Sequence, residues 1–109
     1  METKEMNLWE VMPAVALRGL TIFPNMIIHF DVSRQKSIIA VEQAMMQDQK
    51  LFLVAQKDIA VEDPVQDDVY KIGTIATVKQ VSKLPGGLVR VLVEGVSRAK
   101  LEVLETVTL

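Results

Sequence analysis

The stretch LVRVLVE, residues 88–94, constrains the fold more than any other part of the sequence, because its side chains alternate between two faces. The alternation places three valines on one face: Val89, Val91 and Val93. A period of two residues is typical of a β-strand with one buried face. The preceding LPGG supplies a proline that presets one turn position and a glycine that tolerates positive φ at the next. We therefore expect a β-hairpin whose tip is Leu84–Gly87.

Further strands are expected on both sides of this hairpin. The first strand of the hairpin is expected over Tyr70–Lys83, where Gly73 indicates a bulge or a close approach by another segment. Glu94–Gly95 predicts a second glycine turn, followed by a strand in which apolar residues alternate with charged ones: Ala99, Leu101 and Val103. These segments together predict a β-meander.

Three shorter strands are expected earlier in the chain. Ala14–Arg18 and Met26–Val32 are rich in strand-forming residues and are separated by glycine, proline and asparagine. Leu51–Ala55 is a continuous apolar run, too short for a typical helix, which predicts a central strand buried on both faces. The acidic segment that follows, residues 58–68, has the composition of a solvated loop.

One helix is expected over residues 34–47, with Ser33 as its N-cap. At about 100° per residue, one face of this helix is apolar and predicts contact with the core: Ile38, Val41, Ala44 and Met45. Ile39 and Met46 lie on a flank that we expect to be partly exposed.

The composition indicates one domain built around a single core. The chain has 109 residues, half of them hydrophobic, and no cysteine, which excludes disulfides and thiolate chemistry. Its net charge is −2, and its 12 basic residues are scattered, so nucleic acid is a poor candidate partner. No apolar run approaches the ~18 residues of a membrane span, and we expect a cytoplasmic protein without a membrane partner.

The sequence lacks the constellations that catalysis and metal binding require. His29 is the only histidine and is expected to be packed or edge-exposed rather than a metal ligand. The serines lie in no nucleophile motif, PGG lacks the rest of a phosphate-binding loop, and the acidic segment lacks the spacing of a calcium loop. We therefore expect no catalytic, cofactor or metal site in this chain.

Several segments in combination resemble one known family. They are VALRGLTIFPNMIIHFDVSRQKSIIAVEQAM, LFLVAQKD, DDVYKIGTIATVKQ and KLPGGLVRVLVEGVSRAKLEVL. Together they closely resemble the N-terminal domain of bacterial ATP-dependent Lon proteases over nearly the whole chain after Pro13. The sequence departs from the commonest pattern at Ala16, Gly19 and His29, where proline, aspartate and proline are frequent.

The resemblance implies an α+β, mostly β fold: a PUA-like pseudo-barrel of about six strands with one helix over 34–47. It implies a single β-rich domain over 14–109, cut before a helical part. The mixture of charged and apolar residues that Pro13 closes separately predicts a flexible N-terminal arm over residues 1–13. The strand pattern that still continues at Thr108 and Leu109 agrees with a longer protein. ATP, Mg²⁺, the AAA+ ATPase and the serine–lysine peptidase would belong to downstream modules, so this fragment would be noncatalytic.

The resemblance also implies a function: a substrate-recognition module that captures unfolded, damaged or degron-tagged proteins and contacts other subunits of a homohexamer. Methionine and aromatic residues suit adaptable apolar contact. On that basis the candidate substrate-binding residues are apolar ones at turns and on the helix flank: Phe23, Pro24, Met26, Ile39, Met46, Leu84 and Pro85.

Four of these candidates have a competing interpretation. Phe23 and Met26 could cap the end of the core, and Ile39 and Met46 could be buried against the helical part or another subunit. Trp9 and Met12 in the arm could be disordered. The alternative function is an oligomerisation module that stabilises the hexamer. RNA binding is a remote third, because it requires clustered basic residues that the sequence lacks.

Overall fold

The computed structural model of the chain describes residues 10–105. Trp9 and the rest of residues 1–9, and the strand pattern expected at Thr108 and Leu109, lie outside the described residues. The elements are β1 (Ala14–Leu17), β2 (Ile27–Val32), α1 (Gln35–Met46), β3 (Lys50–Ala55), η1 (Gln66–Asp68), β4 (Ile72–Lys83), η2 (Pro85–Gly87) and β5 (Val89–Lys100). The strands form one sheet in the order β1-β3-β4-β5-β2, and β1 alone pairs in parallel, with β3.

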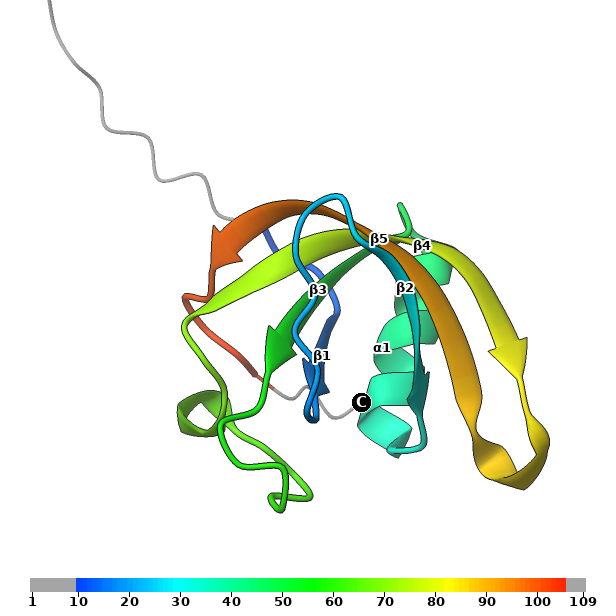
Figure 1. Cartoon of the computed structure of the whole chain (residues 1–109), viewed down its shortest axis with the longest axis horizontal. Helices are drawn as coiled ribbons and strands as arrows, with labels where there is room; N and C mark the ends of the chain where they lie inside the picture. The colour runs from blue at the N-terminus through cyan, green and yellow to red at the C-terminus, as the bar shows by residue number, and fades with distance from the viewer. Residues whose placement is uncertain (1–9, 106–109) are drawn as a thin grey trace, which may run out of the picture.

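The expected mostly β fold with one helix is confirmed. The two longest strands, β4 and β5, form a curved ribbon that arches over α1, while β1 and β2 are the two edges of the sheet (Figure 1). The sheet has five strands rather than about six. The difference arises in β5, where one long strand replaces the two that the sequence predicted.

The hairpin between β4 and β5 forms where the sequence predicted it. Gly86 and Gly87 have φ of 83° and 79°, values that glycine adopts without strain. The N–H of Leu84 donates to the carbonyl of Leu88 at 2.8 Å and closes the tip. The three alternating valines are buried, as expected: Val89, Val91 and Val93.

The turn expected at Glu94–Gly95 is wrong, because β5 runs straight through these residues. Gly95 instead lies beneath a chain crossing: its N–H donates to Met26 O, and its carbonyl accepts from Asn25 N–H, both at 2.8 Å. A Cβ at position 95 would overlap the carbonyl oxygen of Phe23. The glycine therefore serves close backbone approach rather than a turn. The strand also ends at Lys100, so Leu101–Val103 lie outside it.

The sheet has an apolar cluster on each face. The larger lies under α1 and includes Leu51, Leu53 and the buried valines of β5, whereas the smaller contains Phe52, Val54 and Val69. The prediction that β3 is buried on both faces is therefore confirmed, although β4 rather than β3 occupies the middle of the sheet. Gly73 is a close approach, as expected: a Cβ there would lie 2.5 Å from Phe52 Cζ.

The described part of the expected arm lies against the sheet. Met12 packs on the smaller cluster, and Lys50 Nζ is 3.0 Å from the carboxylate of Glu10. The N–H of Phe52 donates to the carbonyl of Pro13 at 2.9 Å, so residues next to β1 continue its pairing with β3.

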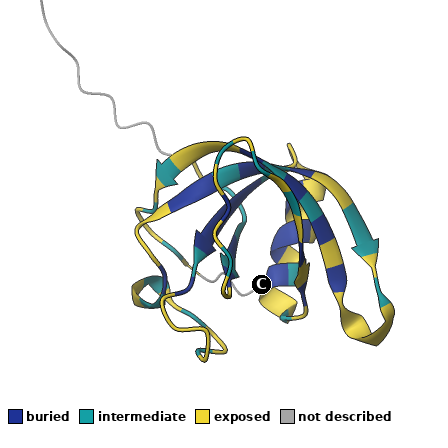
Figure 2. Ribbon diagram, viewed as in Figure 1, coloured by how far each residue is buried: buried dark blue, intermediate teal, exposed yellow. Residues whose placement is uncertain are grey.

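Two details of the helix differ from expectation. Arg34 rather than Ser33 is the N-cap, and no side chain caps the helix. Its guanidinium donates to the carbonyl of Ala16 at 2.6 Å, which ties the start of α1 to β1. The buried stripe consists mostly of small residues, Ser37, Ala40, Val41 and Ala44 (Figure 2). Because small side chains allow close approach, the helix turns this stripe to β1 and β3 and leaves Met45 39% exposed.

Within residues 10–105, no helix combines the length and the apolarity that crossing a membrane requires.

Candidate functional site

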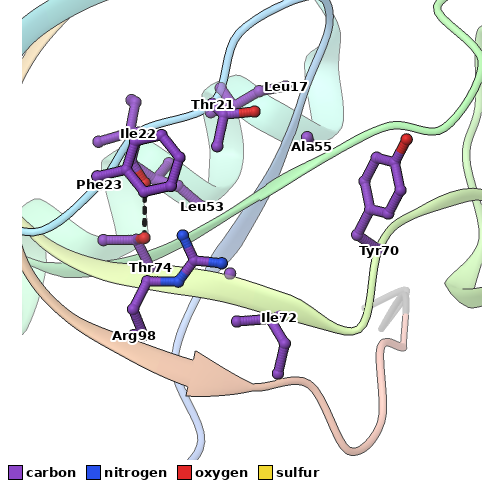
Figure 3. Close-up of a pocket in the computed structure, with 11 residues that line it drawn as sticks. Leu17, Thr21, Ile22, Phe23, Leu53, Ala55, Tyr70, Ile72, Thr74 and Arg98 are labelled. Carbon is purple, nitrogen blue, oxygen red and sulfur yellow. Dashed lines mark hydrogen bonds between the residues drawn. The ribbon is translucent and has the colours of Figure 1, made fainter.

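A groove of about 310 Å³ lies between the sheet and the segment that joins β1 to β2 (Figure 3). Its floor is apolar and consists of Leu17, Ile22 and Leu53, which belong to the larger core cluster. The groove is thus a continuation of the core face. Its rim is formed by larger side chains from three segments: Phe23, Tyr70, Ile72 and Arg98.

The wall of the groove is fixed by a buried hydrogen bond. The hydroxyl of Thr74, which is 1% exposed, donates to the carbonyl of Ile22 at 2.6 Å. This bond ties the segment between β1 and β2 to β4, immediately beside the groove (Figure 3). Because both partners are shielded from water, loss of the hydroxyl would leave an unpaired carbonyl. The structure therefore holds the groove open with a defined wall.

The rim presents large, half-exposed side chains to solvent. Phe23 is 50% exposed, Tyr70 52% and Ile72 45%. The guanidinium carbon of Arg98 lies 5.1 Å from the centroid of the Phe23 ring, a cation–π arrangement. Arg98 makes no ion pair with any residue in the range 10–105. The site can therefore offer both apolar contact and an available positive charge.

The turn that carries Phe23 is held by local contacts. Met26 N–H donates to the carbonyl of Phe23 at 3.2 Å, the N–H of Phe23 points to Met26 Sδ at 3.2 Å, and Asn25 has a φ of 71°. Met26 is half-buried against the larger core cluster, and Pro24 is also half-buried. The sequence left open whether Phe23 and Met26 are core or surface. In the structure, Phe23 is a surface residue, whereas Met26 packs against the core.

The other candidate residues lie away from the groove. Leu84 is half-buried and Pro85 exposed at the hairpin tip. The tip comes directly before Val89, the first residue of β5, and Val89 is six positions, or about 20 Å along the strand, from Gly95. Ile39 and Met46, on α1, are 52% and 86% exposed, as expected for the flank. The structure thus separates the seven candidates into three patches.

Three of the four rim residues were not among the sequence candidates: Tyr70, Ile72 and Arg98. Ile72 lies on β4 and Arg98 on β5, and these two strands pair with each other. In the sequence, nothing distinguishes the two residues from other strand residues. The one local signal was Tyr70, an aromatic residue placed between an acidic loop and a strand.

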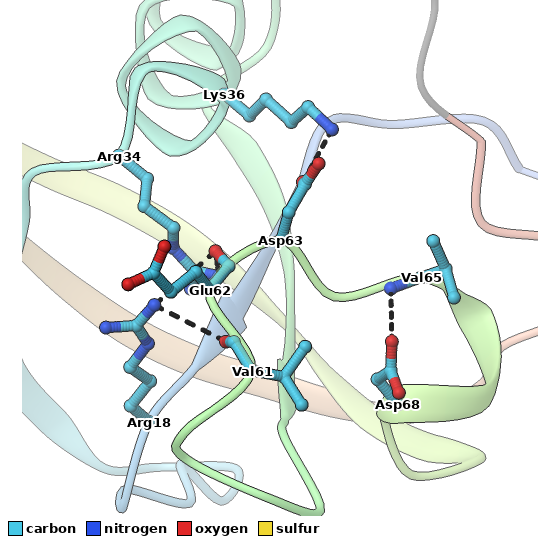
Figure 4. A network of polar contacts seen from close by, with 8 residues as sticks. All are labelled: Arg18, Arg34, Lys36, Val61, Glu62, Asp63, Val65 and Asp68. Atoms are coloured by element: carbon cyan, nitrogen blue, oxygen red, sulfur yellow. Dashed lines mark hydrogen bonds and ion pairs between the residues drawn. The ribbon is translucent and has the colours of Figure 1, made fainter.

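A second, smaller cleft of about 160 Å³ lies between the edges β1 and β2 and is lined in part by Arg18 and Arg34. Both guanidiniums donate to the carbonyl of Glu62, at 3.4 and 3.3 Å, and Lys36 pairs with Asp63 at 2.6 Å (Figure 4). Burial, followed by the charge of Arg18, lowers the pKa of Arg34. This network fastens the acidic loop over β1 and α1, and loop carbonyls already occupy the arginines.

The described part of the chain offers no group of side chains suited to holding a metal ion. Residues 10–105 contain no group of three or more histidine, aspartate or glutamate side chains that could hold an ion. His29 is exposed on the edge strand β2, one of the two environments expected for it.

The chain matches a known family and curated bacterial proteins. The family described as "ATP-dependent protease La (LON) substrate-binding domain" matches residues 11–108. Lon protease of Clostridium acetobutylicum is 55% identical over 93 residues, which cover 85% of this chain and 12% of that protein. Lon protease of Desulforamulus reducens is 55% identical over 91 residues, covering 84% and 11% respectively. The chain therefore spans about an eighth of the length of these relatives.

Solved structures agree with the fold. The N-terminal domain of Mycobacterium avium complex Lon protease superimposes with a TM-score of 0.65 at 20% identity, over 82% of this chain and 44% of that one. A Lon N-terminal domain protein from Xanthomonas campestris gives 0.62 at 12% identity, over 84% and 48%. From the family match and the identity to its bacterial relatives, the chain belongs to the family of Lon substrate-binding domains.

Proposed function

We propose that this chain is the noncatalytic substrate-recognition module of a cytoplasmic, homohexameric ATP-dependent protease, and that it captures unfolded, damaged or degron-bearing proteins. ATP and Mg²⁺ would serve other modules of such a protease, and we assign no cofactor to this chain. The observation that carries the proposal is the groove beside Phe23, where an apolar floor meets a rim of half-exposed large side chains.

The physics of the groove suits weak capture of unfolded chains. An unfolded protein exposes apolar side chains that its folded form buries, so an apolar groove distinguishes the two states. A volume of about 310 Å³ admits one or two side chains. Contacts of this size hold a client weakly and release it readily, which fits delivery to an unfolding motor.

The test is an amide and methyl NMR titration of this chain with one client protein in its unfolded and folded forms, at two protein concentrations. We expect shifts at Phe23, Tyr70 and Ile72 with the unfolded client alone. Phe23→Ser should weaken unfolded-client binding several-fold, because about half of a phenyl ring loses its contact. The matched control is Pro85→Ser, another exposed apolar residue before a positive-φ glycine, and it should have a smaller effect. Equal binding of folded and unfolded client would contradict the proposal.

A second function is favoured by one specific observation. Ile39 and Met46 are exposed on one flank of α1 and do not line the groove beside Phe23, which we call the Phe23 groove. This flank could be buried against another subunit. Sedimentation velocity over a range of concentrations tests this oligomerisation role. Association that Met46→Ser abolishes, without a change in client binding, would assign the helix flank to assembly and leave capture to the groove.

A further inference from the structure

Two cationic side chains, Arg98 and Lys100, lie on the sheet face that forms the groove. Arg98 pairs directly with Thr74, and Lys100 with Ile72, across β4 and β5. Directly paired residues lie on the same face of a sheet, so both cations stand on the face that forms the groove. Lys100 has one exposed ion pair, to Glu102 at 3.9 Å, which contributes little. A chain of net charge −2 thus places positive charge beside this apolar surface.

The Phe23 ring holds the guanidinium of Arg98 near the groove. With 5.1 Å between the guanidinium carbon and the ring centroid, the cation lies against the aromatic surface. Contact with a ring leaves guanidinium N–H groups available, and no carboxylate in residues 10–105 lies within 4 Å of them. Arginine with available N–H groups binds carboxylates specifically, because two of its N–H groups can donate to the two carboxylate oxygens.

The geometry matches a particular arrangement in a bound segment. In an extended chain, residues i and i+2 lie on the same face, about 7 Å apart. An apolar side chain at i can fill the groove against Phe23 and Ile72, and a carboxylate at i+2 can reach Arg98. An unfolded client offers many such internal carboxylates but one terminal carboxylate, so internal acidic residues are the more abundant ligands.

We infer that the Phe23 groove selects extended segments in which an apolar residue is followed two positions later by aspartate or glutamate, with Arg98 binding the carboxylate. This inference rests on the proposed function, because it presumes that the groove binds client segments. It adds a charge requirement to what would otherwise be general apolar capture.

The experiment measures fluorescence anisotropy of short labelled peptides with this chain. The host is a glycine–serine peptide, blocked at both ends, that contains Leu-Ser-Glu or the matched Leu-Ser-Gln. We expect the glutamate peptide to bind about fivefold more tightly. Raising the salt concentration should reduce this ratio, because the contact is partly exposed. A third peptide carries Leu-Ser-Gln with a free terminal carboxylate.

Two variants locate the preference. Arg98→Gln should bring the ratio of affinities close to one, and Arg98→Lys should retain part of it. Arg90→Gln, the same change on the same strand at a site that pairs with Asp31, should leave the ratio unchanged. A ratio of one in the unaltered chain, or a preference that survives Arg98→Gln, would overturn the inference.

The outcomes also separate this inference from the proposed function. If both blocked peptides bind equally and Phe23→Ser weakens both, the groove captures apolar segments without reading charge, and only the inference fails. If neither peptide binds and Phe23→Ser leaves unfolded-client binding intact, the proposed function of the groove fails as well. Tightest binding by the peptide with the free terminal carboxylate would overturn the choice of internal segments.

Discussion

Two turns of this molecule have the same local sequence logic but different roles in the fold. Phe23-Pro24-Asn25 and Leu84-Pro85-Gly86 each place an apolar residue before proline and a positive-φ residue after it, with φ of 71° at Asn25 and 83° at Gly86. The second turn projects from the sheet as a hairpin tip, and a Cβ on either of its glycines would meet nothing within 4 Å. The first crosses β5 at Gly95 and stands beside the groove.

The difference shows that turn chemistry alone does not create a binding surface. Both turns expose apolar atoms, but only the first places them next to a concave floor that the rest of the fold supplies. A flat or convex tip can bury little of a ligand, whereas a groove surrounds a side chain on several sides.

The largest effect is expected from Gly95→Ala, compared with Gly86→Ala in the other turn. A Cβ at position 95 would overlap the backbone of Phe23 and disrupt two hydrogen bonds, so we expect a loss of about 3 kcal/mol in the free energy of unfolding. A Cβ at position 86 has open space and only strains a positive φ, at a cost of about 1 kcal/mol. Urea denaturation of both variants measures the two losses. Equal losses would mean that the crossing yields as easily as the tip.

A smaller difference is expected within the first turn itself. Met26→Ser removes a half-buried side chain that packs on the larger core cluster and should cost about 2 kcal/mol, whereas Phe23→Ser should cost less than about 1 kcal/mol. Thermal denaturation followed by circular dichroism measures both. If Phe23→Ser lowers Tm as much as Met26→Ser does, the phenyl ring belongs to the core and its role as a binding surface is lost.

The wall of the groove gives the next prediction. Thr74→Val keeps the shape of the side chain but removes the hydroxyl that donates to Ile22 O at 2.6 Å, so we expect a loss of about 1.5 kcal/mol. Amide hydrogen exchange should also rise in residues 20–25 and stay unchanged at the hairpin tip. Ser82→Ala, a hydroxyl deletion further along β4, is the control. Uniform exchange changes across the sheet would show that the bond does not act locally.

The smallest effect concerns an ion pair between β2 and β5, where Arg90 Nε lies 2.9 Å from Asp31 Oδ1. The hydrogen bond from Arg90 lowers the pKa of the Asp31 carboxyl. The pair therefore stabilises the fold above the pKa of an unfolded aspartate, about 3.9, and this contribution disappears as the pH falls through the lower folded value. Because the pair is exposed, Asp31→Asn should change Tm near neutral pH by less than about 2 °C.

The acid dependence of Tm is the informative measurement for this variant. Tm of the unaltered chain should fall slightly more than that of Asp31→Asn between pH of about 7 and about 3. Identical acid dependence of Tm in the two proteins would show that the pair contributes nothing to the stability of the fold. Since Asp31 and Arg90 do not line the Phe23 groove, client binding should be the same for both proteins.

Much of the fold could be predicted because it follows local rules. The alternation around Val91, the unbroken apolar run at Leu51–Ala55 and the LPGG tip each specify one structure from a few neighbouring residues. Gly95 could not be assigned, because glycine is equally suited to a turn and to close approach by a distant segment. The resulting error divided β5 into two strands and raised the expected strand number.

For the groove, the sequence supplied one rim residue and the reason to consider it: Phe23 beside a proline in a turn. It could not supply the other rim residues, because Tyr70, Ile72 and Arg98 come to the same groove as Phe23 only through the pairing of β4 with β5 and the crossing at Gly95. Whether an apolar side chain is core or surface depends on which distant segment covers it. Met45 was expected to contact the core but is 39% exposed. Met26 could have been core or surface, and it packs on the larger core cluster.

The mostly β fold with one helix, the hairpin at Leu84–Gly87 and the membership of the family of Lon substrate-binding domains follow from the order of residues, because period, turn chemistry and motif order are local properties of the chain. Three other features follow from packing in three dimensions: the segment at Phe23 crosses β5, the core face continues into an open groove, and Arg98 lies at the rim of that groove. These features depend on contacts between residues as far apart in the chain as Phe23 and Arg98, and such contacts are set by the packing of the whole sheet rather than by any one segment.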